Sequence, residues 1–195
     1  LRSMIRQTIF AVAETDAKPI HTGTLFELRD GTLRLVSVDG YRLAVREEAI
    51  SSGQSIHFVV PGKALSEVSR LLKDEERPLE LRIGNRHILF TIDRYTLISR
   101  LLEGEFLDYR SALPKSHTTE IHVQTRALID SVERVSLLIT DRMKSPVRCV
   151  FSSGEIRLSC STPMGRANDQ IPAQLEGADV EMGFNNRYLL DALRN

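Results

Sequence analysis

The sequence predicts an α+β fold made of two tandem domains, each with antiparallel sheets backed by two helices. Three observations predict it. Short strand-like runs alternate with tight-turn signals, a few longer segments have the apolar spacing of amphipathic helices, and the same order of elements begins again after Pro114. A length of 195 residues accommodates two small domains of this kind.

The first half begins with a helix and a series of hairpins. Ile5, Ile9 and Val12 follow one another at helical spacing, which predicts an amphipathic helix over Met4–Ala13. Asp30–Gly31 is a tight-turn dipeptide between two strand-like runs. The predicted strands are Thr24–Arg29, Thr32–Val38, Arg42–Arg46 and His57–Val60.

A second helix and a meander complete this unit. Pro61–Gly62 ends the last of those strands, and Lys63–Lys73 follows as a helix. Leu65, Val68 and Leu72 form its apolar stripe. The meander consists of strands Leu79–Ile83, His87–Ile92 and Tyr95–Leu102, with turns at Gly84–Asn85 and Asp93–Arg94.

After Leu113–Pro114 and the polar stretch Lys115–Thr119, the order repeats. Gly31–Leu35 corresponds to Gly154–Leu158, so we expect domains at residues 1–116 and 117–195. Leu65, Glu67 and Arg70 correspond in the same way to Leu189, Asp191 and Arg194. The predicted elements are a helix at Thr125–Ile139, a hairpin at Val147–Ser161, a strand at Val180–Phe184 and a helix from near Asn185.

The second copy ends at Asn195, where the register of the first copy predicts about 40 more residues of strands. A sheet without those strands would expose unpaired backbone groups and one apolar helix face. We therefore expect the chain to be an excerpt of a longer protein that continues after Asn195.

Composition excludes several classes of protein. The 26 basic and 26 acidic residues argue against a surface that wraps nucleic acid on all sides, although a basic face remains compatible with them. The sequence contains no membrane-spanning apolar run and no signal peptide, which predicts a cytoplasmic protein without membrane partners. We expect Cys149 and Cys160 to be buried and to pack as small apolar residues. No nucleophile elbow, metal-ligand spacing or phosphate loop occurs, so we expect no catalytic residues, no metal and no cofactor.

Several motifs carry a resemblance to one family. Leu33–Val45 joins two strand-like runs through Asp39–Gly40, and Val60–Lys63, Ser99–Phe106 and Asp108–Arg110 follow in order. Together with Ile5–Val12 they resemble the middle and C-terminal domains of the bacterial DNA polymerase III beta subunit, with close to that family's spacing. The resemblance implies a DNA-clamp fold, with helices on the inner face of a ring. It also implies a non-catalytic processivity factor for DNA replication: a homodimer when full length, encircling duplex DNA and bound by DNA polymerase III, clamp-loader subunits and other proteins through short linear motifs.

The candidate DNA-binding residues are Lys63 and Arg70, which lie about two helical turns apart and project from one face. Arg187 and Arg194 repeat this spacing in the second copy. Such pairs suit contact with phosphates independent of base sequence, and the alternative is an ordinary solvated helix face. The resemblance favours the DNA-binding interpretation, because helices of this kind line the inner wall of the family's ring.

The resemblance also implies a peptide-binding pocket. Gly40 permits close backbone approach, Leu43 offers apolar surface, and Tyr41 and Arg42 present flat groups with polar tips. The alternative is a simple hairpin turn with Leu43 in the core. The residues matched to the pocket are His21, Val38, Gly40, Tyr41, Arg42, Leu43, Leu107 and Ala112, of which His21, Val38 and Leu107 depart from the residues usual in the family.

A third candidate site is the end of the predicted helix Thr125–Ile139. Leu137, Leu138 and Ile139 are three consecutive apolar residues, more than one amphipathic stripe requires, so at least one should face outward. The resemblance implies a subunit interface here, and the alternative is a buried helix end.

Two functions stay open at this point: a DNA-encircling tether that docks peptides, and a stand-alone peptide-binding module without a nucleic-acid role.

Overall fold

The computed structural model describes residues 1–15, 18–73, 79–140 and 145–195, and the chain divides into two compact units, Leu1–Leu113 and Pro114–Asn195. The division falls just before Pro114, whereas the sequence led us to expect a boundary at residue 116. Each unit has its own apolar core, and we describe each by itself.

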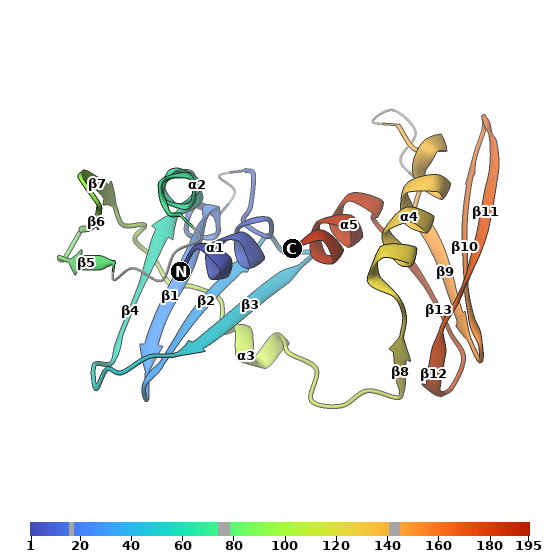
Figure 1. Ribbon diagram of the computed structural model, residues 1–195, viewed down its shortest axis with the longest axis horizontal. Helices are drawn as coiled ribbons and strands as arrows, with labels where there is room; N and C mark the ends of the chain where they lie inside the picture. Colours follow the sequence, from blue (N-terminus) through green and yellow to red (C-terminus); the bar gives the residue numbers. More distant parts are fainter. Residues whose placement is uncertain (16–17, 74–78, 141–144) are drawn as a thin grey trace. The chain divides into compact units, whose positions relative to one another are not determined.

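In the first unit, a sheet in the antiparallel order β3-β2-β1-β4 carries two helices on one face (Figure 1). Met4 and Ile5 of α1 and Leu65 and Val68 of α2 pack with Phe26 of β1 in one core. A smaller sheet in the order β5-β6-β7 adds Ile88 and Phe90 to that core. The elements are α1 (Arg2–Ile9), η1 (Pro19–Thr22), β1 (Gly23–Arg29), β2 (Thr32–Val38), β3 (Leu43–Ala49), β4 (Ile56–Pro61), α2 (Gly62–Leu71), β5 (Glu80–Ile83), β6 (His87–Ile92), β7 (Tyr95–Arg100) and α3 (Tyr109–Ala112).

The second unit repeats this topology. Its main sheet has the order β11-β10-β9-β13, so β9, β10, β11 and β13 take the places of β1, β2, β3 and β4. Its core joins Val132 of α4 and Leu190 of α5 to the sheet. The elements are β8 (Thr119–His122), α4 (Thr125–Val135), η2 (Ser136–Leu138), β9 (Val147–Ser152), β10 (Glu155–Thr162), β11 (Gly165–Pro172), β12 (Gln174–Gly177), β13 (Val180–Phe184) and α5 (Asn186–Arg194).

The opposite face of the first sheet has a separate apolar cluster. Leu25, Val36 and Val59 project from it and pack with Ile20 of η1 and Tyr109 of α3. Side chains alternate along a strand, so one sheet supplies both this cluster and the core under the helices. The segment between β7 and α3 therefore lies against the face that the helices leave uncovered.

Turn chemistry explains the hairpins. Asp30 and Gly31 both have positive φ, at 52° and 69°, as a type I′ turn requires, and this matches the right-handed twist of β1 and β2. Asp93 likewise has φ 51° between β6 and β7. Gly154 turns β9 into β10 with φ 91°, at the position equivalent to Gly31.

Some predicted boundaries were wrong. The first helix ends at Ile9 rather than Ala13, and the chain continues in turns in which the Ala11 N–H donates to Thr8 O at 3.0 Å. The helix predicted to reach Ile139 ends at Val135 and continues as the 3₁₀ turn η2. Neither α3 nor the strands β8, β11 and β12 was predicted from the sequence.

Candidate functional site

The exposed face of α2 carries the first pair of candidate cations. Lys63 and Arg70 are both exposed, while Leu65 and Val68 on the other side of the helix are fully buried. Arg70 Nη1 lies 2.7 Å from Glu67 Oε1 one turn back, so its charge is already compensated. Among the residues that the structure describes, Lys63 has no ion pair, which leaves its charge fully available to an anion.

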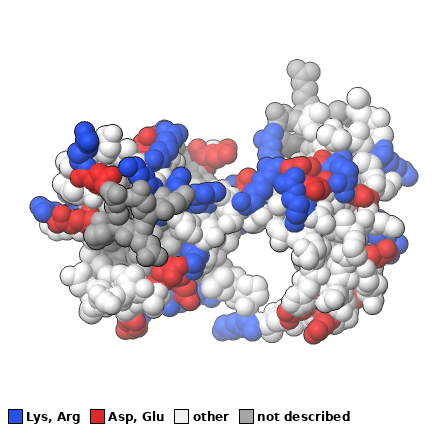
Figure 2. All heavy atoms as spheres, in the orientation of Figure 1, with Lys and Arg blue, Asp and Glu red and all other residues white. Residues whose placement is uncertain are grey.

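The second pair lies on α5. Arg187 and Arg194 are exposed at its two ends, and the Asn185 side chain caps the helix by accepting hydrogen bonds from the Arg187 and Tyr188 N–H groups. Arg194 Nη2 forms an ion pair with Glu133 of α4. Figure 2 shows basic and acidic atoms interleaved over α4 and α5.

Sequence reasoning overlooked the cations on the first helix of each unit. Arg6 is exposed on α1, and Arg126 and Arg134 are exposed on α4. Arg126 pairs with Asp130 at 3.0 Å, and Arg134 pairs with Asp169 of β11 at 2.6 Å. These cations could have been predicted from the sequence. The predicted helices Met4–Ala13 and Thr125–Ile139 each have basic residues outside their apolar stripe.

The turn between β2 and β3 is held by one carboxylate. Asp39 Oδ1 accepts from the Tyr41 and Arg42 N–H groups at 3.0 and 3.1 Å, and its Oδ2 accepts from Arg42 Nε at 2.8 Å. The Arg42 guanidinium also lies 5.5 Å from the Phe10 ring centroid. Arg42 is therefore a structural part of the turn, whereas the Tyr41 side chain is 85% exposed.

Gly40 has φ 91°, and a Cβ added there would meet no atom within 4 Å. We expected this glycine to permit close approach of a peptide backbone, and the structure leaves room for one beside it. The conformation of the turn is what requires glycine. The space beside it is open.

The structure brings several predicted pocket residues together. Val38 and Leu43 are direct cross-strand partners, and Leu43 and Phe106 each pack against the apolar cluster on the face opposite the helices. His21 is buried and meets Phe106 edge to face with ring centroids 5.4 Å apart. Burial and the charge of Lys18 lower the pKa of His21, so its imidazole is neutral near pH 7 and serves as apolar packing.

Leu107 and Ala112 come from the segment that crosses this face. Leu107 is 41% exposed and follows Phe106, the residue that contacts His21. Ala112 is exposed at the end of α3, and no described hydrogen bond or ring contact joins it to the turn at Gly40.

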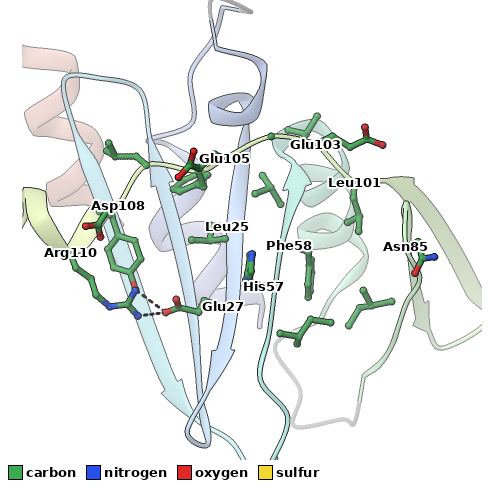
Figure 3. A pocket seen from close by; sticks show the side chains of 18 of the residues that line it. Leu25, Glu27, His57, Phe58, Asn85, Leu101, Glu103, Glu105, Asp108 and Arg110 are labelled. Atoms are coloured by element: carbon green, nitrogen blue, oxygen red, sulfur yellow. Dashed lines mark hydrogen bonds and ion pairs between the residues drawn. The ribbon is translucent and has the colours of Figure 1, made fainter.

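Glu27 of β1 anchors the same segment. Its Oε2 accepts from the Tyr109 hydroxyl at 3.0 Å and from Arg110 Nη2, and Arg34 Nη1 lies 3.8 Å away. Burial alone would raise the pKa of Glu27, but the hydrogen bonds from Arg110 and Tyr109 and the charges of Arg110 and Arg34 hold it below its ordinary value. Figure 3 shows this contact at the edge of a pocket of about 560 Å³ beneath the segment.

At the end of α4, one of the three apolar residues faces solvent, as predicted. Leu137 is 81% exposed, whereas Leu138 and Ile139 are half-buried and Ile139 packs on the core of its unit. An isolated exposed leucine is common on protein surfaces, so its exposure alone assigns no role.

Both cysteines are buried, and burial raises the pKa of Cys149 to about 11, which keeps its thiol protonated and unreactive. Within the described ranges no group of three or more His, Cys, Asp or Glu side chains could hold a metal ion. Across the same residues, every helix is too short or too polar to cross a membrane.

Comparison with known proteins covers nearly the whole chain. Residues 1–108 match the central domain of the DNA polymerase III beta subunit, and residues 110–195 match its C-terminal domain. The beta sliding clamp of Bacillus subtilis is 33% identical over 199 residues, covering 100% of this chain and 53% of the relative. That of Pseudomonas putida is 33% identical over 196 residues, covering 99% of this chain and 53% of the relative.

Solved structures agree with these matches. The DNA polymerase sliding clamp of Bacillus subtilis has a TM-score of 0.95 at 32% identity, covering 99% of this chain and 52% of its own length. The DNA polymerase III subunit beta of Pseudomonas aeruginosa has a TM-score of 0.92 at 31% identity, covering 99% and 53%. The chain thus spans about half the length of the relatives it matches. By motif order, topology and similarity along both units, it belongs to the DNA polymerase III beta subunit family.

Proposed function

We propose that this chain forms part of a DNA sliding clamp, a non-catalytic ring that encircles duplex DNA and tethers the replicative polymerase to it. Membership of the family supports the proposal. Because the chain spans about half of its relatives, the closed ring, its DNA and its protein partners all belong to the proposal. A cytoplasmic location, where bacterial DNA is replicated, is part of it.

The observation that carries the proposal is the repetition of cations on equivalent helices. Lys63 and Arg70 on α2 correspond to Arg187 and Arg194 on α5, and all four are exposed. Lysine and arginine at such positions attract phosphates without reading bases. A surface built this way suits movement along DNA rather than binding at one sequence.

Lys63→Glu tests the DNA contact. The salt dependence of binding to labelled duplex DNA is measured by fluorescence anisotropy, and loss of one phosphate contact should lower the slope of log K against log salt by about one. Arg100→Glu is the matched control, since Arg100 is exposed on β7 and has no described ion pair. Equal slopes for Lys63→Glu and the unaltered chain would contradict the proposed role of α2.

The proposal extends to peptide docking by polymerase III, clamp-loader subunits and other partners. The pocket wall in the first unit would be formed by Val38, Leu43 and Leu107, with Tyr41 exposed beside them. His21 packs behind Phe106 and would support the wall. The proposed remaining contributors are Gly40, Arg42 and Ala112.

Leu43→Ala is a better test of docking than Arg42→Ala, because Arg42 also holds the turn through Asp39. Titration of a labelled peptide with Leu and Phe anchors should give weaker binding for Leu43→Ala, and thermal unfolding checks that the variant remains folded at the temperature of the titration. Undiminished affinity would contradict this site.

Leu137, together with Leu138 and Ile139, is the proposed contact with a second subunit in the homodimer ring.

A further inference from the structure

The segment Leu101–Ala112 is fixed to the outer face of the first sheet at several points. The Leu102 N–H donates to the Val59 carbonyl at 2.9 Å, which ties its start to the edge strand β4. Phe106 packs against His21, and Tyr109, only 4% exposed, is buried in the cluster on that face. Leu107 lies between the last two of these anchors.

The anchor on the far side of Leu107 depends on one carboxylate. Tyr109 and Arg110 belong to α3, a single turn of four residues, which is too short to be stable by itself. Both donate to the same oxygen of Glu27, whose side chain is 16% exposed in the middle of β1. The close-up in Figure 3 shows Arg110 reaching down to Glu27 from the ribbon of the segment. Hydrogen bonds to a charged group of this kind are stronger than neutral ones.

We propose that Glu27 is a positioning residue of the peptide-binding site: by holding Tyr109 and Arg110 it fixes the segment that presents Leu107. Glu27 itself does not touch the peptide. This inference rests on the proposed docking function, because Glu27 can affect peptide binding only if Leu107 forms part of the pocket wall. It also gives the Asp108–Arg110 motif a role, as the clasp of the segment on the sheet.

Glu27→Gln keeps the size of the side chain and an acceptor oxygen but removes the charge that Arg110 needs. We expect affinity for the Leu- and Phe-anchored peptide to fall about three- to tenfold, as for loss of one charge-assisted hydrogen bond. Tyr109→Phe removes one donor and keeps the buried ring, so it should give a smaller loss. Glu47→Gln is the matched control, because Glu47 bonds Arg34 at 2.8 Å on the same face and has no described hydrogen bond or ion pair with the segment.

Trypsin cleavage measures, without any peptide, how firmly Glu27 holds the segment that contains Tyr109 and Arg110. Cleavage after Arg110 should be slow in the unaltered chain and fast in Glu27→Gln, while cleavage after the exposed Lys115 stays the same in both. A general loss of stability would instead accelerate cleavage throughout the unit, so the ratio of the two sites separates positioning from unfolding. Glu47→Gln should match the unaltered chain.

The outcomes are distinct. If Arg110 stays protected in Glu27→Gln, or if it is cleaved rapidly while peptide affinity is unchanged, the inference is overturned. If the unaltered chain does not bind the peptide, the docking function fails and the inference falls with it, even when cleavage after Arg110 accelerates. Faster cleavage after Arg110 together with weaker peptide binding supports the inference.

Discussion

Single residues in this protein often do something other than what their type first indicates. Arg42 was expected to bind a ligand, yet its guanidinium already contacts the Asp39 carboxylate and the Phe10 ring. His21 was matched to the peptide-binding pocket, and the structure buries it as a neutral packing residue. Such assignments depend on contacts between residues distant in sequence, as with His21 and Phe106, and a local pattern does not contain them.

The Glu27 carboxylate makes stability depend on pH. Its pKa is lower in the folded protein than in the unfolded chain, so its contribution is complete above the ordinary glutamate pKa and disappears as pH falls through the folded value. The charged and titratable groups around it are Arg34, His57, Tyr109 and Arg110. We expect acid unfolding of Glu27→Gln to start from lower stability at neutral pH and to approach the unaltered protein in acid. Urea titrations between pH 3 and pH 7 would measure this, and a constant difference across that range would contradict it.

Gly40→Ala tests the turn conformation. The added methyl meets no neighbour within 4 Å, so its cost comes from the positive φ of 91° alone. We expect a loss of roughly 1 kcal/mol in unfolding free energy of the first unit. Denaturant unfolding gives the value. The control is Gly53→Ala, which also has open space but no positive φ, and it should cost less; equal losses would rule out the backbone explanation.

At the scale of elements, the sequence predicted best where two signals agreed. Thr32–Val38, His87–Ile92 and Val180–Phe184 were predicted with the observed bounds, because β-branched residues and flanking turn residues point the same way. β11 was missed because Asn168, Asp169 and Gln170 have low strand propensity, and its pairing with β10 overrides that preference. α3 was missed because tertiary contacts, rather than its four residues, hold it.

The candidate site was predictable only in part. Spacing on predicted helices identified Lys63 and Arg70, and the structure leaves both exposed. Spacing could not indicate which cations already have a partner. That depends on side chains such as Glu133, which reaches Arg194 from another helix.

The ion pairs lead to a prediction about the helices. Lys63 lacks a described partner, whereas Arg70 pairs with Glu67 and Arg194 pairs with Glu133. Lys63→Glu should therefore weaken duplex DNA binding more than Arg194→Glu, since a phosphate must compete with the existing carboxylate. Parallel anisotropy titrations at low salt compare the variants. A larger effect at Arg194 would show that the ion pair does not limit its contact with DNA.

At the scale of the whole molecule, the two units have separate cores. Val68 and Val132 are both fully buried, the first in the core under α1 and α2 and the second in the core under α4 and α5. We expect Val68→Ala and Val132→Ala each to cost roughly 2 kcal/mol in its own unit and nothing in the other. Hydrogen exchange resolved by segment measures both units in one sample. Equal loss of protection in both units after either change would mean that they unfold together.

The compensated arginines have a consequence for motion along a duplex. In the proposed clamp, Arg70 or Arg194 in contact with a phosphate would exchange one anion for another, with the carboxylate of Glu67 or Glu133 still close by. Because one exposed ion pair would replace another, we expect each step from one phosphate to the next to have a small free-energy barrier. A surface of this kind would hold DNA loosely with little friction, leaving retention to ring closure rather than to affinity.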